Sequence, residues 1–482
     1  METFLWHDYE TFGANPAVDR PSQFAAIRTD FDLNIIGEPI QLYCKPSDDY
    51  LPQPEACLIT GITPQDADRD GYIEADFIRL INDELSIPLT CTAGYNSIRF
   101  DDEVTRHLLY RNFYDPYARE WQNGNSRWDI IDLVRLVYAV RPESLTWPTR
   151  EDGQVSFRLE ELTACNGIAH ESAHDAMSDV YATIALAKLI KTRCPDLYTH
   201  ALSLRDKRFV KSLFDTSSFK PVFHISSMYP ASLGCCAVVA PLAEHPVNKN
   251  GVIVFDLRHN PDELISLSVD EIKRRIFTPA KDLGEDEQRL ALKVVHTNKC
   301  PIVTPMALTT EIAPEYRQKH ELIGDVLREN LAKLKAVPDI GKKISQVFMG
   351  ERHNLSEPTD PEQMLYSGGF FGHNDKTIMS KITTLDKSEL QYFEATFSDE
   401  RLPELFFRYK ARNYPDLLTE EEHEQWESYR TQRLHEGDSW RLSLQKYAEE
   451  LTRLAKEHEG DNRAQIILED LKLYAESIMP YG

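Results

Sequence analysis

The chain has 482 residues, of which 41% are hydrophobic and 10% aromatic, so it is long enough for about three globular domains and is not a disordered chain. Its formal net charge of -24 excludes a protein that coats nucleic acid through bulk positive charge. An acidic enzyme can still gather its Lys and Arg side chains in one groove, so nucleic acid stays open as a substrate.

The cysteines give no sign of a zinc site or of a disulfide framework. None forms a Cys-x-x-Cys pair, and Cys235 and Cys236 are adjacent. The start of the chain lacks a basic segment followed by an apolar one, and no apolar run reaches the roughly 18 residues of a membrane span. We therefore expect reduced thiols in a cytoplasmic protein that makes no membrane contact.

The first predicted element is a short strand that ends in a turn at Gly13. Apolar and aromatic residues lead into Asp8 and Glu10. Side chains alternate along a strand, so the two carboxylates project from one face, where they repel each other unless a cation neutralises them. Divalent cations prefer such hard oxygen ligands. The pair predicts a metal site, although two acids on a solvated edge strand would also fit this segment taken alone.

Residues 1–195 alternate strand-like and helix-like segments, which favours an α/β architecture for the first domain. The sequence of residues 90–96 predicts a strand that ends in a turn. A helix with an acidic first turn is predicted to begin near Phe100. The clearest helix runs from Asp175 to Lys191, where apolar residues recur three and four positions apart.

The pattern changes in the middle of the chain. Residues 196–350 contain short β-like runs, and Asn250-Gly251 is a hairpin signal, so we expect a small β domain with added helices, one of them over 315–337. Residues 351–482 form the predicted C-terminal domain, which is helical from about residue 360 and begins with a linker over 351–363. Two apolar stripes carry this helical prediction: Leu444, Tyr447, Leu451 and Leu454, and Ile467, Leu471 and Tyr474.

Two later segments place acids beside a turn or a helix start. One is the run from Asn96 to Phe100-Asp101, and the other is the run from His174 to Asp179. With the Asp8-x-Glu10 strand, they resemble the three motifs of the DEDDh exonuclease superfamily, D-x-E, N-x(2,3)-F/Y-D and H-x(4)-D. The resemblance implies four metal ligands and a general base, His174. The implied ligands are Asp8, Glu10, Asp101 and Asp179.

These residue types fit phosphodiester hydrolysis. Two divalent ions about 3.5–4 Å apart can activate a water and stabilise the leaving oxygen. A histidine that titrates near neutrality can accept the proton of that water. Five residues of α-helix turn through about 500°, so His174 must lie in the loop or first turn if it is to share a site with Asp179. Ser172 is the expected N-cap, and we assign Asp101 rather than Asp102 because it follows Phe100.

The resemblance extends over nearly the whole chain. The sequence segments that show the resemblance are HDYETFG, GYNSIRFDDEVTR, SFRLE, HESAHDAMSDVYATIALAKL, HTNKCP and FRYKARNYP. Together they are similar to bacterial exonuclease I, a family of single-strand-specific DNA exonucleases. The family implies processive 3′→5′ removal of deoxynucleoside 5′-monophosphates from single-stranded DNA in DNA repair and recombination. It also implies two Mg²⁺ ions per site, which Mn²⁺ can replace.

The same resemblance implies a fold and partners. We expect an RNase H-like exonuclease domain with a mixed sheet flanked by helices over 1–195, an SH3-like β-rich middle domain over 196–350 and an all-helical C-terminal domain over 351–482. The family implies that these join into a clamp around the strand. The implied partners are single-stranded DNA and the acidic C-terminal tail of the single-stranded DNA-binding protein, and we expect a monomer.

Residue types indicate candidate DNA contacts in all three regions. Tyr117 and Trp121 are four residues apart, so on a helix they would form a shelf for stacked bases, although a core aromatic pair fits them equally well. Arg135 and Arg158 lie in an apolar context, which suits phosphate clamps or snorkelling surface residues. The expected substrate contacts are Glu10, Arg106, Tyr117, Trp121, Arg135, Arg158, Lys207, His296, Lys299, Arg408 and Arg412.

Two other functions are alternatives to a DNA exonuclease. An RNA exonuclease or a proofreading nuclease of the same superfamily would use the same acids. It would not need so long an extension beyond residue 195, but an RNase can also carry accessory domains. A binding module that kept the fold and lost catalysis fits poorly, because all five catalytic residue types are in place.

Overall fold

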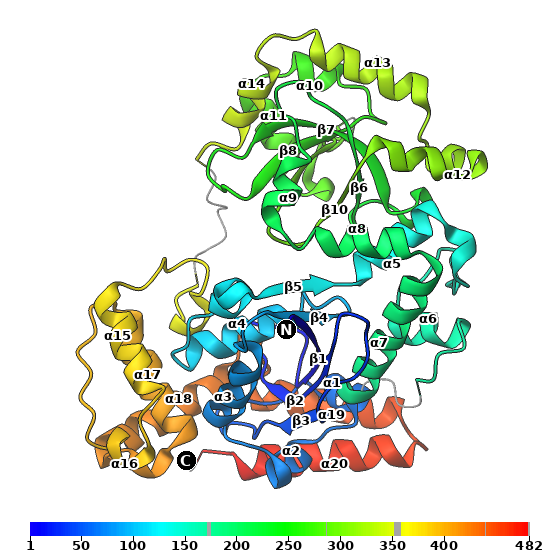
Figure 1. Cartoon of the computed structure of the whole chain (residues 1–482). Helices are drawn as coiled ribbons and strands as arrows, with labels where there is room; N and C mark the ends of the chain where they lie inside the picture. The colour runs from blue at the N-terminus through cyan, green and yellow to red at the C-terminus, as the bar shows by residue number, and fades with distance from the viewer. Residues whose placement is uncertain (171–174, 286, 351–357, 439, 481–482) are drawn as a thin grey trace. The chain divides into compact units, whose positions relative to one another are not determined.

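Figure 1 shows a computed structural model of the chain, which describes residues 1–170, 175–285, 287–350, 358–438 and 440–480. The chain divides into two compact units. The first comprises residues 1–126, 170–183 and 355–482, and the second comprises residues 127–169 and 184–354. The two ends of the chain therefore fold into the same unit. The predicted boundaries after residues 195 and 350 stay predictions.

A five-stranded mixed sheet carries the N-terminal region. The strand order is β3-β2-β1-β4-β5, so β1 is a central strand and not an edge strand. It pairs antiparallel with β2 and parallel with β4, and all of its residues except Asp8 are buried. The strands are β1 (Thr3–Thr11), β2 (Pro21–Thr29), β3 (Ile40–Tyr43), β4 (Thr90–Gly94) and β5 (Ser126–Asp129).

Helices pack on the first sheet much as the sequence predicts. Leu5 and Tyr9 of β1 meet Phe77 and Leu108 in one apolar core, which fixes two of these helices against the sheet. The predicted strand over 90–96 and the helix that follows it are confirmed. The α-helices of this region are α1 (Pro54–Thr60), α2 (Pro64–Asp70), α3 (Glu74–Leu85), α4 (Asp101–Arg111) and α7 (Ala176–Arg193).

The C-terminal helices belong to the first unit. Their predicted apolar stripes are confirmed: Tyr447 and Leu471, for example, lie in one buried cluster with Phe12 and Cys57 of the N-terminal region. The helices are α15 (His373–Ile382), α16 (Lys387–Leu390), α17 (Arg401–Asn413), α18 (Glu420–Glu436), α19 (Leu444–Glu457) and α20 (Asn462–Ser477). Helix α20 also packs against α1 and α2.

Buried ion pairs strengthen this association. Arg412 of α17 lies 2.9 Å from the carboxylate of Asp49 and also pairs with Glu362. Glu362 in turn lies 3.1 Å from Arg20, and Arg433 lies 3.1 Å from Asp49. The prediction of a linker over 351–363 is therefore wrong for its described part, 358–363, because Glu362 is a buried counter-charge with only 5% of its surface exposed.

The second unit contains a five-stranded antiparallel sheet in the order β10-β6-β7-β8-β9, which confirms the predicted small β domain. Its strands are β6 (Val222–Ile225), β7 (Cys236–Glu244), β8 (Gly251–Asp256), β9 (Leu292–His296) and β10 (Ile302–Pro305). Its helices are α5 (Ile131–Val140), α6 (Leu159–Cys165), α8 (Pro195–Ser203), α9 (Lys207–Ser212), α10 (Asp262–Ser266), α11 (Val269–Phe277), α12 (Pro314–Lys319), α13 (Gly324–Lys335) and α14 (Ile340–Val347).

The single helix predicted over 315–337 is wrong, because the chain forms two helices there, α12 and α13. The break falls at Glu321, whose φ of 56° lies in the left-handed region that an α-helix does not use. His320 beside it is 1% exposed. The sequence carries a signal of this break, because residues 317–321 are all polar and Gly324 follows soon after them.

All eight cysteines are described, and none forms a disulfide. Within the described residues, the structure contains no helix that is both long enough and apolar enough to cross a membrane.

Removing the charge of Asp49 tests the buried ion pairs. Burial raises the pKa of this carboxyl, but Arg412 and Arg433 lower it well below its ordinary value, so the group is ionised at neutral pH. Asp49→Asn leaves two buried arginines without this counter-charge and should lower the free energy of unfolding of the full chain by about 3–5 kcal/mol, measured by urea denaturation at pH 7. Asp325→Asn is the matched control, because its carboxylate is 92% exposed beside Arg328. Equal, small losses in both variants would contradict this account.

Candidate active site

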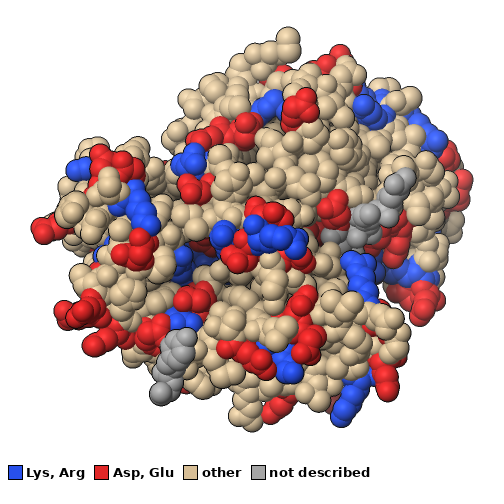
Figure 2. Space-filling view, turned by 90° about the horizontal axis from the view of Figure 1, so that it is seen from below, with Lys and Arg blue, Asp and Glu red and all other residues tan. Residues whose placement is uncertain are grey.

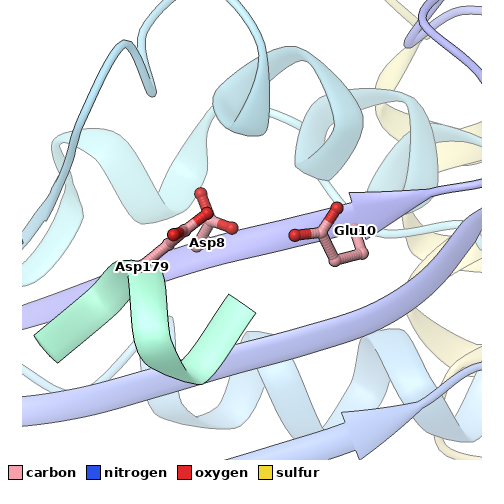
Figure 3. A group of neighbouring side chains, drawn as sticks. All are labelled: Asp8, Glu10 and Asp179. Carbon is pink, nitrogen blue, oxygen red and sulfur yellow. The ribbon is translucent and has the colours of Figure 1, made fainter. Parts of the chain in front are cut away.

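Three carboxylates converge where β1 meets the start of α7. Asp8 and Glu10 project from the same face of β1, as alternation along a strand requires, and Asp179 approaches them from α7 (Figure 3). One ligand atom of each side chain lies within 4.8 Å of those of the other two. Among the residues that the structure describes, this is the one group of His, Cys, Asp and Glu side chains placed to hold a metal ion.

Burial and mutual repulsion perturb these acids strongly. Burial, and then the charges of Asp101, Glu10 and Asp179, raise the pKa of Asp8 well above its ordinary value. Burial, followed by the charge of Asp179, raises the pKa of Glu10 to about 9. Without a cation the group therefore retains protons at neutral pH. The donor set fits a divalent cation, because hard oxygen ligands and excess negative charge are what such an ion needs.

Asp101 lies beside this group of carboxylates, whereas the neighbouring Asp102 pairs with an arginine. The strand β4 pairs with β1 only as far as Trp6, so the N–H of Tyr9 lies beyond that ladder and donates to Oδ1 of Asp101 at 3.0 Å. Asp102 instead forms a 2.6 Å ion pair with Arg119, and both side chains are almost fully buried. The two neighbouring acids thus face different partners, and the assignment of Asp101 as a metal ligand stays a prediction.

The start of α7 is anchored to the strand next to β1. Gln23 of β2 lies opposite Glu10 in the β1–β2 register, and its side-chain oxygen accepts a hydrogen bond from the N–H of Ala176 at 3.1 Å. Asp175 accepts one from the N–H of Ser178 at 3.2 Å, as an N-cap side chain does. These contacts place Asp179, one turn further along, over Asp8. The predicted general base, His174, and the predicted N-cap, Ser172, lie outside the described residues.

Sequence motifs alone missed Gln23, Asp175 and one further neighbour of the acids, His170. Its Nε2 atom lies 2.5 Å from Oδ1 of Asp179. His170 and Asp175 stand in the same run as the third motif, so their positions gave a signal. Gln23 gave none, because only the strand pairing brings it to the start of the helix.

The two predicted aromatic contacts do not lie on one α-helix. Tyr117 and Trp121 flank a single 3-10 turn, Ala118–Glu120, so the predicted helical shelf is wrong. Both side chains nevertheless line one pocket of about 680 Å³ together with Phe370 and Phe371. Trp121 is 65% exposed, which rules out the alternative of a core aromatic pair.

Comparisons with known proteins identify the family. A model described as an exonuclease matches residues 5–187, a model of the exonuclease I SH3-like domain matches 205–350, and a model of the exonuclease I C-terminal domain matches 359–478. The exodeoxyribonuclease I of Escherichia coli K12 is 45% identical over 479 residues, which are 99% of this chain and 98% of that protein. The chain belongs to the exonuclease I family.

Other members agree over the full length. The exodeoxyribonuclease I of Haemophilus influenzae is 44% identical over 98% of both chains. The exonuclease I of Methylocaldum szegediense superposes with a TM-score of 0.93 at 46% identity, covering 99% of this chain and 100% of that one. A zinc-bound complex of E. coli exonuclease I with single-stranded DNA superposes with a TM-score of 0.91 at 44% identity, covering 99% of each chain. The predicted family and fold class are confirmed.

Several basic residues predicted to contact DNA are already engaged by acids of the first unit. Arg106 forms ion pairs with Glu103 at 2.6 Å and with Glu120 at 2.7 Å, and its guanidinium lies 5.4 Å from the ring centre of Tyr117. It is 6% exposed. Direct phosphate binding by this arginine would require these pairs to open, so Arg106 serves first to fix the neighbouring aromatic residue.

Arg408 and Arg412 are engaged by acids in the same way. Arg408 pairs with Asp360 at 2.7 Å and with Glu404 at 2.8 Å, while Arg412 holds Asp49 and Glu362. Their side chains are 8% and 5% exposed. This burial argues against the prediction that they contact a DNA strand, because their donors already neutralise carboxylates inside the protein.

The predicted contacts in the second unit differ in exposure. Arg135 forms a 2.5 Å ion pair with Asp132 and lies 5.5 Å from the ring centre of Phe157, so it is largely enclosed. His296 is half-buried. The Arg158 side chain is 67% exposed, and Lys207 and Lys299 are exposed as well, so these three are accessible to a phosphate.

Acidic and basic side chains alternate on the face shown in Figure 2, and the residues described there form no continuous basic surface. On this face, a site for nucleic acid would therefore depend on local groups and on bound cations rather than on a general positive field.

Replacing Asp101 and Asp102 one at a time separates their roles. Asp101→Asn should abolish metal-dependent hydrolysis while the thermal midpoint is retained, because it removes a proposed ligand from a repulsive group. Asp102→Asn should instead destabilise the protein by about 3–5 kcal/mol, because it leaves the buried Arg119 without its counter-charge. Nuclease assays and thermal unfolding of both variants provide the measurement. An inactive, fully stable Asp102→Asn beside an active Asp101→Asn would reverse the assignment.

The raised pKa values also predict a pH dependence of stability without metal. An unfolded chain loses the Glu10 proton near pH 4.5, whereas the folded chain retains it up to about pH 9, so the folded state loses stability as pH rises through this window. Asp8→Asn removes one repelling charge. Its thermal midpoint in EDTA should exceed that of the unmodified protein at pH 8, and the gain should shrink at pH 5. A gain that is independent of pH would contradict the repulsion account.

Proposed function

We propose that this chain is a 3′→5′ exonuclease that degrades single-stranded DNA to deoxynucleoside 5′-monophosphates with the help of divalent cations. The observation that carries the proposal is the partly buried group of Asp8, Glu10 and Asp179, whose crowding calls for a cation. The family supports the substrate, since the curated relatives are named exodeoxyribonuclease I and one solved relative is described as a complex with single-stranded DNA.

The proposed chemistry assigns a role to each acid. Asp8, Glu10, Asp101 and Asp179 would hold two divalent cations, Mg²⁺ in the cell with Mn²⁺ as a substitute. When bound, such ions supply an activated water and stabilise the oxygen that leaves the phosphorus. His174 is proposed to accept the proton of the attacking water. Glu10 is proposed to touch the substrate as well, because it lies at the end of the acidic group beside the β1–β2 bulge.

Binding of the strand is proposed to combine aromatic stacking with a few accessible cations. The pocket between Tyr117, Trp121 and Phe370 suits bases of any sequence, because every base offers a face to stack on. Arg158, Lys207 and Lys299 are accessible to phosphates. His296, Arg135 and Arg106 are proposed to act from more enclosed positions.

Four further properties are carried over from the family as proposals. They are processive digestion, a role in DNA repair and recombination, binding of the acidic tail of the single-stranded DNA-binding protein, and action as a cytoplasmic monomer. Processivity is supported by one solved relative, an exonuclease I whose structure is described as suggesting how processivity is achieved.

A comparison of nucleic acids tests the proposed activity. The full chain with Mg²⁺ should shorten a 5′-labelled single-stranded DNA from its 3′ end and release 5′-monophosphates, and EDTA should stop the reaction. RNA of the same sequence should be digested far more slowly. Asp8→Ala should abolish hydrolysis by the folded protein, since it removes a ligand from the acidic group. Equal digestion of RNA would favour an RNA exonuclease, and an active Asp8→Ala variant would refute the metal site.

A further inference from the structure

One contact at the active site involves a residue to which the assignment of the third motif to His174 and Asp179 gives no role. His170 lies in the loop before α7, and its Nε2 atom is 2.5 Å from Oδ1 of Asp179. The His170 side chain is 4% exposed, whereas that of Asp179 is 19% exposed. The imidazole therefore holds this carboxylate from the protein interior, on a side that solvent does not reach.

Asp179 needs such a partner more than the other acids of the group do. Asp8 and Glu10 are fixed by a central strand, but Asp179 reaches them from a separate helix. Its negative charge repels both of theirs, as the raised pKa values of those two groups show. A carboxylate in this position turns away from its neighbours unless a donor holds it. A donor on one oxygen fixes the plane of the carboxylate and so the direction from which an ion can approach it.

Backbone and side chain of this segment are held by different residues. Gln23 binds the N–H of Ala176 and so sets where α7 begins. It cannot set the orientation of the Asp179 carboxylate, which depends on side-chain torsions. The contact with His170 supplies that second constraint.

We propose that His170 is a positioning residue that donates a hydrogen bond to Asp179 and thereby orients this carboxylate to bind a divalent cation. It is not the general base, because Nε2 faces Asp179 and is not available to a water. The inference rests on the proposed function, since it requires Asp179 to be a metal ligand.

Binding of Mn²⁺ gives a readout that does not depend on catalysis. The full chain without DNA is titrated with Mn²⁺, and free Mn²⁺ is followed by electron paramagnetic resonance. His170→Ala should weaken binding by about 10–100-fold, the usual cost of losing a group that orients a metal ligand. His170→Gln keeps an N–H donor and should recover most of the affinity. His435→Ala, which removes an exposed histidine from α18, should bind as the unmodified protein does.

Kinetics and folding complete the test. Circular dichroism and thermal midpoints establish that each variant is folded. Raising the Mn²⁺ concentration should restore kcat of His170→Ala, while KM for DNA stays unchanged. Unchanged Mn²⁺ affinity in His170→Ala, or an equal loss in His170→Ala and His170→Gln, would overturn the proposal.

Asp179→Ala distinguishes failure of this inference from failure of the proposed function. If Asp179→Ala loses Mn²⁺ binding and His170→Ala does not, only the positioning role is wrong. If Asp179→Ala also binds Mn²⁺ as tightly as the unmodified protein, the metal assignment itself is wrong.

Discussion

Repulsion among crowded, partly buried carboxylates is the constraint on which the active site depends. Asp8 and Glu10 occupy a central strand whose other residues form the core, so neither can move away without disturbing the sheet. Asp101 and Asp179 bring further negative charge to the same place. Burial raises the pKa of Asp8 and Glu10, so the metal-free site stores protons that a cation must displace. The protein thus pre-forms a site that is unfavourable until an ion neutralises it.

The buried carboxylates that contact the C-terminal helices differ from the active-site acids, because arginines of the protein neutralise them. Asp49 and Glu362 are neutralised by arginines of the protein itself, and their pKa values are lowered despite burial. Because Arg412 and Arg433 come from the C-terminal helices, these helices complete the fold of the N-terminal region. A fragment that ends at residue 195 would leave Asp49 without its arginine partners. Such a fragment cannot separate the contribution of the later regions to processivity from their contribution to folding.

Features set by near neighbours in the chain could be predicted, and features set by distant ones could not. Alternation placed Asp8 and Glu10 on one face, and helical periodicity found the stripes of α19 and α20. Arg408 and Arg412 are buried because acids from remote segments pair with them. The basic run in the sequence could not reveal this burial. The break at Glu321 needs a backbone conformation that periodicity does not encode. The spacing of Tyr117 and Trp121 predicted that they share a surface, and both line one pocket. The element between them is a 3-10 turn and not the predicted helix.

The pairing of β1 with β2 ties these parts of the site together. Glu10 lies opposite Gln23, so one register places a proposed metal ligand and also the anchor for the start of α7. The register shifts directly after Glu10, at a bulge between Glu10 and Thr11, and bulges commonly lie next to active sites, where they redirect a strand. A slip of one residue would turn Asp8 and Glu10 to the face that packs on α3 and α4, and it would move the anchor of α7 as well. The register of the sheet and the side chain of Gln23 therefore together set where α7 begins relative to the strand acids.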